Sequence, residues 1–227
     1  MIIDVIIPAF NEEMALPKVI ADIPSNLVRE IIVVDNGSTD NTIEVAKKAN
    51  ASVIIAKQKG YGSACLKGLE YVSQKEIKPN ILVFLDGDYS DYPEQMTQLV
   101  EPIKKNKADL VIGSRTIGKK AKGSMTIPQI IGNKLATTLL KWFYNIEFTD
   151  LGPFRAIRYE SLLALEMEDQ NFGWTVEMQL KAAKLGLRSV EVAVDYRKRI
   201  GKSKISGTVK GAVSAGFIII KTIFKYR

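Results

Sequence analysis

Two carboxylates separated by a glycine follow an apolar run near the middle of the chain. Residues 81–85 have the composition of a buried strand. Asp86, Gly87 and Asp88 come directly after them. Carboxylates at this spacing are suitable ligands for a hard cation such as Mg²⁺ or Mn²⁺, which would in turn hold a diphosphate. Gly87 leaves room for a bulky ligand at the backbone. The alternative is an acidic turn without a ligand, because Asp-Gly is common in turns.

Polar segments also follow three other apolar runs, each of which has the composition of a strand. These runs lie at 2–7, 30–34 and 52–56, and the segments after them are 8–12, 35–38 and 59–62. In α/β sheets, ligands bind where the carboxyl ends of the strands meet the loops. We therefore expect the four segments to converge on one crevice, with Lys59 and Gly60 facing the ligand from a basic, glycine-bearing loop.

Strands and helices are expected to alternate through the first half of the chain. Strands are predicted at 2–7, 30–34, 52–56, 81–85 and 109–113, and helices at 15–23, 42–49, 63–72 and 91–103. This order is typical of an α/β fold with a mainly parallel sheet that helices cover on both faces. The chain has neither G-x-G-x-x-G after its first strand nor G-x-x-x-x-G-K-[ST], which argues against dinucleotide and P-loop binding.

The motifs at these strand ends resemble those of family 2 glycosyltransferases with the GT-A fold. They lie in the expected order at 6–12 (IIPAFNE), 33–40 (VVDNGSTD) and 85–88 (LDGD), and the likeness extends through 113–115 (GSR). Two further segments, 152–155 (GPFR) and 199–204 (RIGKSK), are most similar to dolichyl-phosphate mannose or glucose synthases and their bacterial polyprenyl-phosphate relatives.

The resemblance implies a nucleotide-diphosphate sugar as donor and a divalent metal, Mg²⁺ or Mn²⁺. Pro8, Phe10 and Glu12 would border the base and the ribose. Asp35 and Asn36 would meet the base. The family often has a second aspartate at the position of Asn36. An amide oxygen can still accept a hydrogen bond from a uracil or guanine N–H, so the identity of the base stays open.

The resemblance also assigns residues to the diphosphate and the metal. Asp86 would face the ribose or the metal, Asp88 the metal that bridges the diphosphate, and Arg115 the sugar or the diphosphate. A basic loop late in the chain matches the region that meets donor or acceptor phosphate in similar enzymes. Its candidate residues are Arg197, Arg199, Ser203 and Lys204. Flexible basic turns also hold anions through their backbone N–H groups.

The chemistry of sugar transfer agrees with these assignments. Breaking the sugar–diphosphate bond leaves negative charge on the diphosphate, which a divalent cation and nearby Lys or Arg side chains stabilise. An acceptor that attacks from the opposite face gives inversion. A hydroxyl acceptor needs a carboxylate base, whereas a lipid phosphate is already anionic and needs no strong base. The chain has no histidine, which excludes imidazole catalysis and His-ligated zinc.

The acceptor side is expected in the second half of the chain. Asp150 is the leading candidate for a carboxylate base; alternatively it orients Arg155 or forms a structural Asp–Arg pair. Glu177 is a second candidate base, and Trp174 is placed to stack on a sugar face.

The other elements of the second half are predicted from apolar periodicity and glycine content. A glycine- and lysine-rich segment at 117–125 would close over the donor or form a surface connection. An apolar helix at 130–144 ends in Trp142, Phe143 and Tyr144, which would line a lipid path or pack in the core. A strand is expected at 154–158, a helix at 173–185, a strand at 187–195 and a basic loop at 196–204.

Positive charge is concentrated at the C-terminal end of the chain. The net charge is +7, but residues 197–227 hold nine Lys or Arg and no Asp or Glu, which leaves 23 basic and 25 acidic residues elsewhere. This distribution argues against a nucleic-acid-binding protein and suggests a local site for phosphate or anionic lipid, or else a solubilising tail. A helix at 208–226 has an apolar face with lysines opposite, so we expect it in a membrane interface, or docked on the domain or on a second subunit.

Cysteine usage and the chain ends indicate the compartment. The single cysteine, Cys65, excludes an internal disulfide, fits a reducing compartment and is expected in the core. The N-terminus lacks the features of a signal peptide, and the apolar run at 212–220 is too short to span a bilayer. We expect a cytoplasmic protein that is peripheral on the cytoplasmic membrane face.

Together these features predict a metal-dependent, inverting glycosyltransferase that moves a sugar to a polyprenyl phosphate. Residues 1–205 would form the GT-A domain, with a donor half at 1–115 and an acceptor half at 116–205, followed by an amphipathic helix at 206–227. Three alternatives stay open: transfer to a hydroxyl of a soluble acceptor or glycan, a sugar-1-phosphate nucleotidyltransferase, and a non-catalytic binding module.

Overall fold

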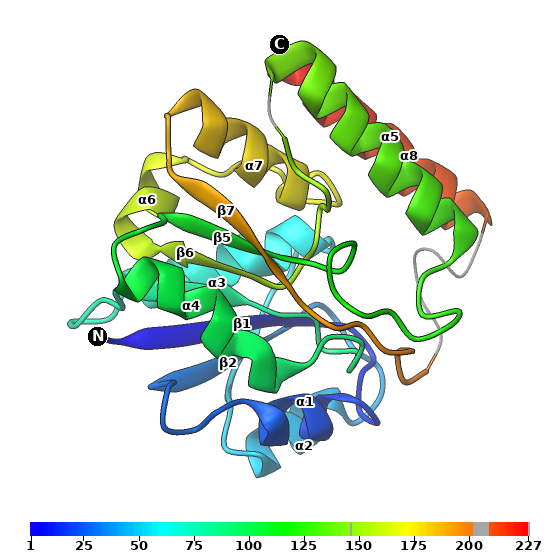
Figure 1. The fold of residues 1–227 in the computed structure, drawn as a ribbon. Helices are drawn as coiled ribbons and strands as arrows, with labels where there is room; N and C mark the ends of the chain where they lie inside the picture. Colours follow the sequence, from blue (N-terminus) through cyan, green and yellow to red (C-terminus); the bar gives the residue numbers. More distant parts are fainter. Residues whose placement is uncertain (146, 202–208, 227) are drawn as a thin grey trace.

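Seven strands form one sheet at the centre of the molecule, in the order β3-β2-β1-β4-β6-β5-β7 (Figure 1). The computed structural model describes residues 1–145, 147–201 and 209–226. The strands are β1 Ile3–Ala9, β2 Glu30–Asp35, β3 Ser52–Ile55, β4 Ile81–Phe84, β5 Leu110–Ser114, β6 Arg155–Arg158 and β7 Ser189–Ala193. β6 runs antiparallel to its neighbours β4 and β5, and the remaining pairs are parallel. The predicted mainly parallel α/β sheet is confirmed.

Helices cover both faces of this sheet. They are α1 Leu16–Asp22, α2 Thr42–Lys48, α3 Tyr61–Ser73, α4 Met96–Lys104, α5 Ile127–Tyr144, α6 Tyr159–Ala164, α7 Trp174–Lys184 and α8 Val209–Lys225, with a 3-10 turn η1 at Pro93–Gln95. The predicted helices are present, whereas α6 was not foreseen. It is one turn and a half long, too short to show an apolar period of its own.

The central strands are buried on both sides, which explains their uninterrupted apolar runs. Val5 and Ile7 of β1 pack with α1 and α4, whereas Ile6 between them packs with α3. The approach of α3 is close: a Cβ at Gly68 would lie 2.8 Å from the Ile6 side chain. Cys65 is fully buried in the same layer, as expected of a core residue.

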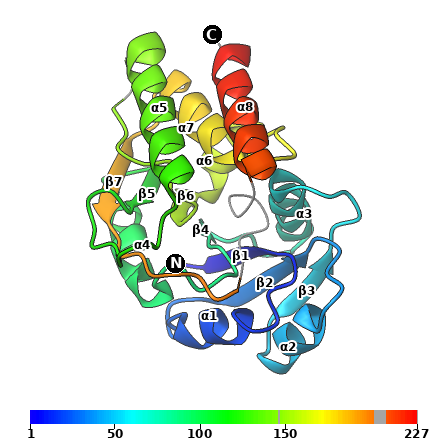
Figure 2. The ribbon, with the colours of Figure 1, turned by 90° about the vertical axis from the view of Figure 1, so that its right-hand side faces the viewer.

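Helices α5 and α8 lie side by side and project beyond the sheet at one end of the molecule (Figures 1 and 2). Both pack on α7 through a third apolar cluster, to which α5 contributes Leu140 and α8 contributes Ile223. Of the three aromatic residues that end α5, Tyr144 packs at this cluster, whereas Trp142 is 75% exposed. Within the part of the chain that is described, no helix combines the length and the hydropathy needed to cross a bilayer.

The sheet runs through both predicted halves of the domain, because β6 from the second half inserts between β4 and β5 of the first. The boundary between the halves at 115 and 116 stays a prediction. The second boundary, at 205 and 206, lies outside the described residues.

Candidate active site

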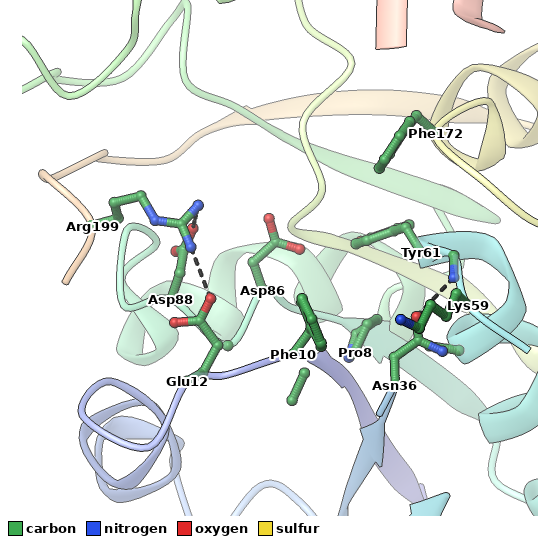
Figure 3. Close-up of a pocket in the computed structure, with 14 residues that line it drawn as sticks. Pro8, Phe10, Glu12, Asn36, Lys59, Tyr61, Asp86, Asp88, Phe172 and Arg199 are labelled. Carbon is green, nitrogen blue, oxygen red and sulfur yellow. Dashed lines mark hydrogen bonds and ion pairs between the residues drawn. The ribbon is translucent and has the colours of Figure 1, made fainter. Parts of the chain in front are cut away.

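A cavity of about 310 Å³ lies at the carboxyl ends of β1, β2 and β4 (Figure 3). Its walls come from four loops that follow strands, from the start of α3, and from two residues of the second half of the chain. The lining residues are Pro8, Ala9, Phe10, Glu12, Asn36, Lys59, Gly60, Tyr61, Ala64, Asp86, Gly87, Asp88, Phe172 and Arg199. The expected convergence of the strand-end segments is therefore observed.

Arg199 joins two carboxylates that come from different strand ends (Figure 3). Its Nη2 atom lies 2.8 Å from Glu12 Oε1, and its Nη1 atom lies 3.0 Å from Asp88 Oδ2. The other oxygen of Asp88 accepts hydrogen bonds from the backbone N–H and the hydroxyl of Ser90. The basic loop late in the chain thus reaches the acidic motif.

Asp86 is held in a different environment from Asp88. Its Oδ1 atom is enclosed by the protein and has no hydrogen-bond partner among the described residues. Burial, and after it the negative charge of nearby Asp88, raise the pKa of Asp86 to about 7. A cation between the two carboxylates would relieve both effects, so this pair fits a divalent metal.

Arg115 and Asp150 form a buried pair behind the cavity. Nε and Nη2 of Arg115 lie 2.8 Å and 2.7 Å from the two carboxylate oxygens, and the Arg115 backbone N–H donates to the same carboxylate. Burial alone would lower the pKa of this guanidinium, but Asp150 raises it above its usual value. Neither residue lines the cavity.

Comparison with known proteins identifies the family. The sequence profile described as Glycosyl transferase family 2 matches residues 4–165. The chain belongs to this family. It is a glycosyltransferase. This family membership excludes two of the alternatives, a sugar-1-phosphate nucleotidyltransferase and a non-catalytic binding module.

Two of the proteins that this glycosyltransferase resembles are named for different acceptors. An uncharacterized glycosyltransferase of Mycobacterium tuberculosis is 34% identical over 94% of each chain. The undecaprenyl-phosphate mannosyltransferase of Micrococcus luteus is 31% identical, over 91% of this chain and 88% of its own. A crystal structure of glucosyl-3-phosphoglycerate synthase from M. tuberculosis, in complex with Mn²⁺, UDP-glucose and phosphoglyceric acid, has a TM-score of 0.79. It is 23% identical and covers 99% of this chain and 79% of its own, which confirms the GT-A fold.

The structure assigns Asn36 of this glycosyltransferase a contact that was not foreseen. Its Nδ2 donates to Gln58 O at 2.7 Å, and its Oδ1 accepts from Gly60 N at 2.7 Å. The amide therefore anchors the loop that carries Lys59 into the cavity. Asp35 is buried and lies outside the lining; its Oδ2 accepts two backbone N–H groups and its Oδ1 has no partner in the described chain.

The expected link between Asp150 and Arg155 is wrong. The carboxylate of Asp150 pairs with Arg115, while the Arg155 guanidinium donates to the carbonyl oxygens of Gly152 and Thr175. Burial lowers the pKa of Arg155 to about 10. A structural Asp–Arg pair is present, but with a partner 35 residues away along the chain.

Two predicted acceptor-side residues are part of the core. Glu177 is fully buried and accepts hydrogen bonds from the backbone of Glu168 and Asp169 and from the hydroxyl of Tyr226, so it anchors α8 and is not a base at the cavity. Trp174 is also fully buried, with its ring centroid 5.8 Å from that of Phe84, so it cannot stack on a sugar.

Arg197 lies outside the cavity and fastens the basic loop to the acidic turn. Its Cζ atom lies 3.3 Å from the ring centroid of Tyr89 and 4.2 Å from that of Tyr92. It also donates to the carbonyl oxygens of Tyr89 and Asp91. These contacts hold the guanidinium of Arg197 away from the cavity lining, and its expected phosphate contact stays a prediction. Ser203 and Lys204 lie outside the described residues.

Three residues of the site were missed by the sequence analysis. Phe172 and Tyr61 line the cavity, and Figure 3 shows Asp86 between Tyr61 and the Arg199–Glu12 pair. Asp91 is buried near Asp86 and Asp88, outside the cavity lining, and neither of its carboxylate oxygens is bonded within the described chain. Burial and the nearby acids raise its pKa well above the usual value. The only sequence signal for Asp91 is its place three residues after Asp88.

Proposed function

We propose that this glycosyltransferase moves a sugar, with inversion, from a nucleotide-diphosphate sugar to a polyprenyl phosphate. The observation that carries this proposal is the state of the carboxylates at the cavity. Among the described residues, those that line it are Glu12, Asp86 and Asp88. Arg199 pairs with both Glu12 and Asp88, and the two aspartates would form the cation site. None of these three described carboxylates is left as a base, which suits an acceptor that is already anionic.

The donor side of the proposal rests on the loops that meet in the cavity. Asp86 and Asp88 would hold Mn²⁺ or Mg²⁺, which stabilises the negative charge of the leaving diphosphate. The described residues contain no preformed cluster of three metal-binding side chains, so diphosphate oxygens and water would complete the coordination. Pro8, Phe10 and Lys59 would border the nucleoside, and Arg199 would neutralise phosphate charge.

The names of relatives support a lipid acceptor and also supply the second candidate. The mannosyltransferase of Micrococcus luteus acts on undecaprenyl phosphate by its name. The structural neighbour from M. tuberculosis is named for a soluble acceptor, 3-phosphoglycerate. Both acceptors carry a phosphate, but only the first places the enzyme at a membrane surface, where α8 was predicted to lie.

Two measurements test this function. A thermal-shift screen of nucleoside diphosphates with and without Mn²⁺ should find one that stabilises the protein only with the metal. Radiolabelled sugar from the matching donor should then appear on polyprenyl phosphate in detergent. Transfer to 3-phosphoglycerate or to a glycan hydroxyl, with none to the lipid, would reject the polyprenyl-phosphate acceptor.

A further inference from the structure

Two segments that are distant in sequence share one unusual composition. Residues 116–146 contain five lysines and no Asp or Glu, and residues 197–227 contain nine Lys or Arg and no Asp or Glu. The rest of the chain holds 18 basic and 25 acidic residues. These two segments thus carry all of the excess positive charge of the protein. The second segment is the C-terminal end of the chain, whereas the first lies in its middle.

The fold brings these segments together. The first contains α5 and the second contains α8, and the two helices lie side by side (Figures 1 and 2). At their C-terminal ends, the rings of Phe143 and Phe224 have centroids 5.4 Å apart, and the Tyr144 hydroxyl donates to the carbonyl oxygen of Ile223. Helices α5 and α8 therefore form one surface, which, together with the described connection 116–126, we call the α5–α8 surface.

Large apolar side chains of the α5–α8 surface point away from the protein. Ile127, Ile131 and Leu135 recur every four residues and therefore share one side of α5, opposite the buried Ala136 and Leu140. Trp142 lies on the same side and is 75% exposed. On α8, Phe217 and Phe224 are 67% and 46% exposed, whereas Ile223 is fully buried against the domain.

Lysines flank this apolar area. Lys134 and Lys221 are exposed on α5 and α8, and Lys119, Lys120 and Lys122 are exposed on the connection between β5 and α5. Lys141 and Lys225 pair with Glu147 and Glu168, both at the C-terminal ends of the helices. Among the described residues of this surface, most of the exposed lysines that have no ion pair therefore lie toward the N-terminal end of α5, where the chain arrives from β5.

We propose that the α5–α8 surface binds an anionic lipid bilayer. Exposed aliphatic and aromatic side chains flanked by lysines are the composition that lies in a membrane interface. The charge argues against a second copy of this chain as the occupant, because two such surfaces would repel each other. The proposal extends the polyprenyl-phosphate function, but the binding itself requires neither donor nor acceptor.

Chain connectivity ties this surface to the cavity. Segment 116–126 begins directly after Arg115, and its residue Ala121 donates to the carbonyl oxygen of Tyr196 at 2.8 Å. Arg199, three residues after Tyr196, lies in the cavity. Through this contact the connection between β5 and α5 is joined to the loop that carries Arg199 into the cavity.

Tryptophan fluorescence tests the proposal without any assay of transfer. The chain has two tryptophans, of which Trp142 is exposed and Trp174 is fully buried. Vesicles of phosphatidylglycerol and phosphatidylcholine should shift the emission to shorter wavelength, and brominated acyl chains should quench it. In Trp142→Phe both effects should be absent while the protein still co-sediments with the vesicles. An unchanged spectrum with native protein and anionic vesicles would overturn the proposal.

Charge and apolar variants separate the two contributions to binding. We expect Lys134→Glu with Lys221→Glu, and Ile131→Ser with Phe217→Ser, each to weaken vesicle binding roughly tenfold or more. The matched controls are Lys47→Glu with Lys48→Glu on α2, and Ile77→Ser, whose side chain is 63% exposed outside the α5–α8 surface. The proposed bilayer binding would be overturned if the control variants weakened vesicle binding as much as the α5–α8 variants. It would also be overturned if the protein were a dimer in solution that Ile131→Ser dissociates. Vesicle binding that persists without any transfer to lipid would reject the acceptor and not the surface.

Discussion

Arg199 connects the C-terminal basic loop with two strand-end segments of the candidate active site. It comes from the C-terminal basic loop, yet it pairs with Glu12 after β1 and with Asp88 after β4. The loop is kept in register by Arg197, which stacks on Tyr89, and by the Ile200 N–H, which donates to the carbonyl oxygen of Asp88. A residue 111 positions after Asp88 is thereby placed within hydrogen-bond distance of it.

Replacement of Asp88 should remove the metal site without removing the fold. Asp88→Asn keeps the shape of the side chain but loses the charge that binds a cation, so we expect transfer to fall by roughly a hundredfold or more. Nucleotide-dependent stabilisation by Mn²⁺, measured by thermal shift, should disappear as well. Glu44→Gln, at an exposed position of α2, is the control. A variant at residue 88 that retains half of the activity would contradict the assignment.

Replacement of Arg199 and Arg197 should have different consequences. Arg199→Met removes a charge-assisted hydrogen-bond donor from the cavity, so the KM for the donor should rise about tenfold or more. Arg197→Met removes stacking on Tyr89 and Tyr92 outside the cavity, so its main effect should be a lower Tm. Steady-state kinetics and thermal unfolding of both variants provide the test. A raised KM in Arg197→Met at unchanged Tm would mean that the two roles are reversed.

At the scale of elements, Asp109 holds three strand ends together. It precedes β5, and its carboxylate accepts from Arg158 at the end of β6 and from Arg188 just before β7, at distances of 3.1 Å and 2.8 Å. The hydrogen bond from Arg188 lowers the pKa of Asp109 to about 2, with Arg158 acting in the same direction. Segments that are remote in sequence are thus joined at the edge of the sheet farthest from β3.

The stabilisation by Asp109 should depend on pH in a defined direction. A carboxyl whose pKa is lower in the folded state stabilises the fold above its unfolded pKa of about 4, and the effect is lost as the pH falls toward 2. Because Arg188 is half exposed, we expect Asp109→Asn to cost only about 1 kcal/mol at pH 7. Urea unfolding at several pH values should show the difference from wild type shrinking as the pH falls from about 4 to about 2. A difference that grows on acidification would contradict this account.

The observed helices and strands also show which sequence signals were sufficient to predict an element. The start of α5 is set by Thr126 and Gln129, which form a reciprocal capping box that extends the predicted helix by three residues. The strands β1, β2 and β4 were found because they are apolar on both faces. The position of β6 between β4 and β5 had no such signal, because the order of strands in a sheet depends on pairing between distant segments.

At the scale of the whole molecule, the charge of the protein is divided between two regions. The α5–α8 surface belongs to segments that carry 14 basic residues and no acidic residue, whereas the remainder carries a net negative charge. An anionic bilayer would attract the first region and repel the second, so it would orient the enzyme with the α5–α8 surface toward the lipid phosphates.

This division predicts a salt dependence that differs between two assays. Transfer to polyprenyl phosphate embedded in anionic vesicles should fall several-fold when NaCl is raised from about 50 mM to about 500 mM, because the attraction is screened. Transfer to the same lipid in a neutral detergent should change much less. Equal salt sensitivity in the two assays would locate the effect in the cavity instead of at the α5–α8 surface.

The sequence by itself determined the fold class, the order of the elements, the acidic pair Asp86 and Asp88, and the loops that line the cavity, because each depends on local periodicity or on short motifs at strand ends. Tertiary structure alone decided that Asp150 pairs with Arg115, that Phe172 and not Trp174 faces the cavity, and that α5 joins α8 in one surface. These contacts link residues far apart in the chain. Their partners are selected by the packing of the whole domain, for which the spacing of residues carries no signal.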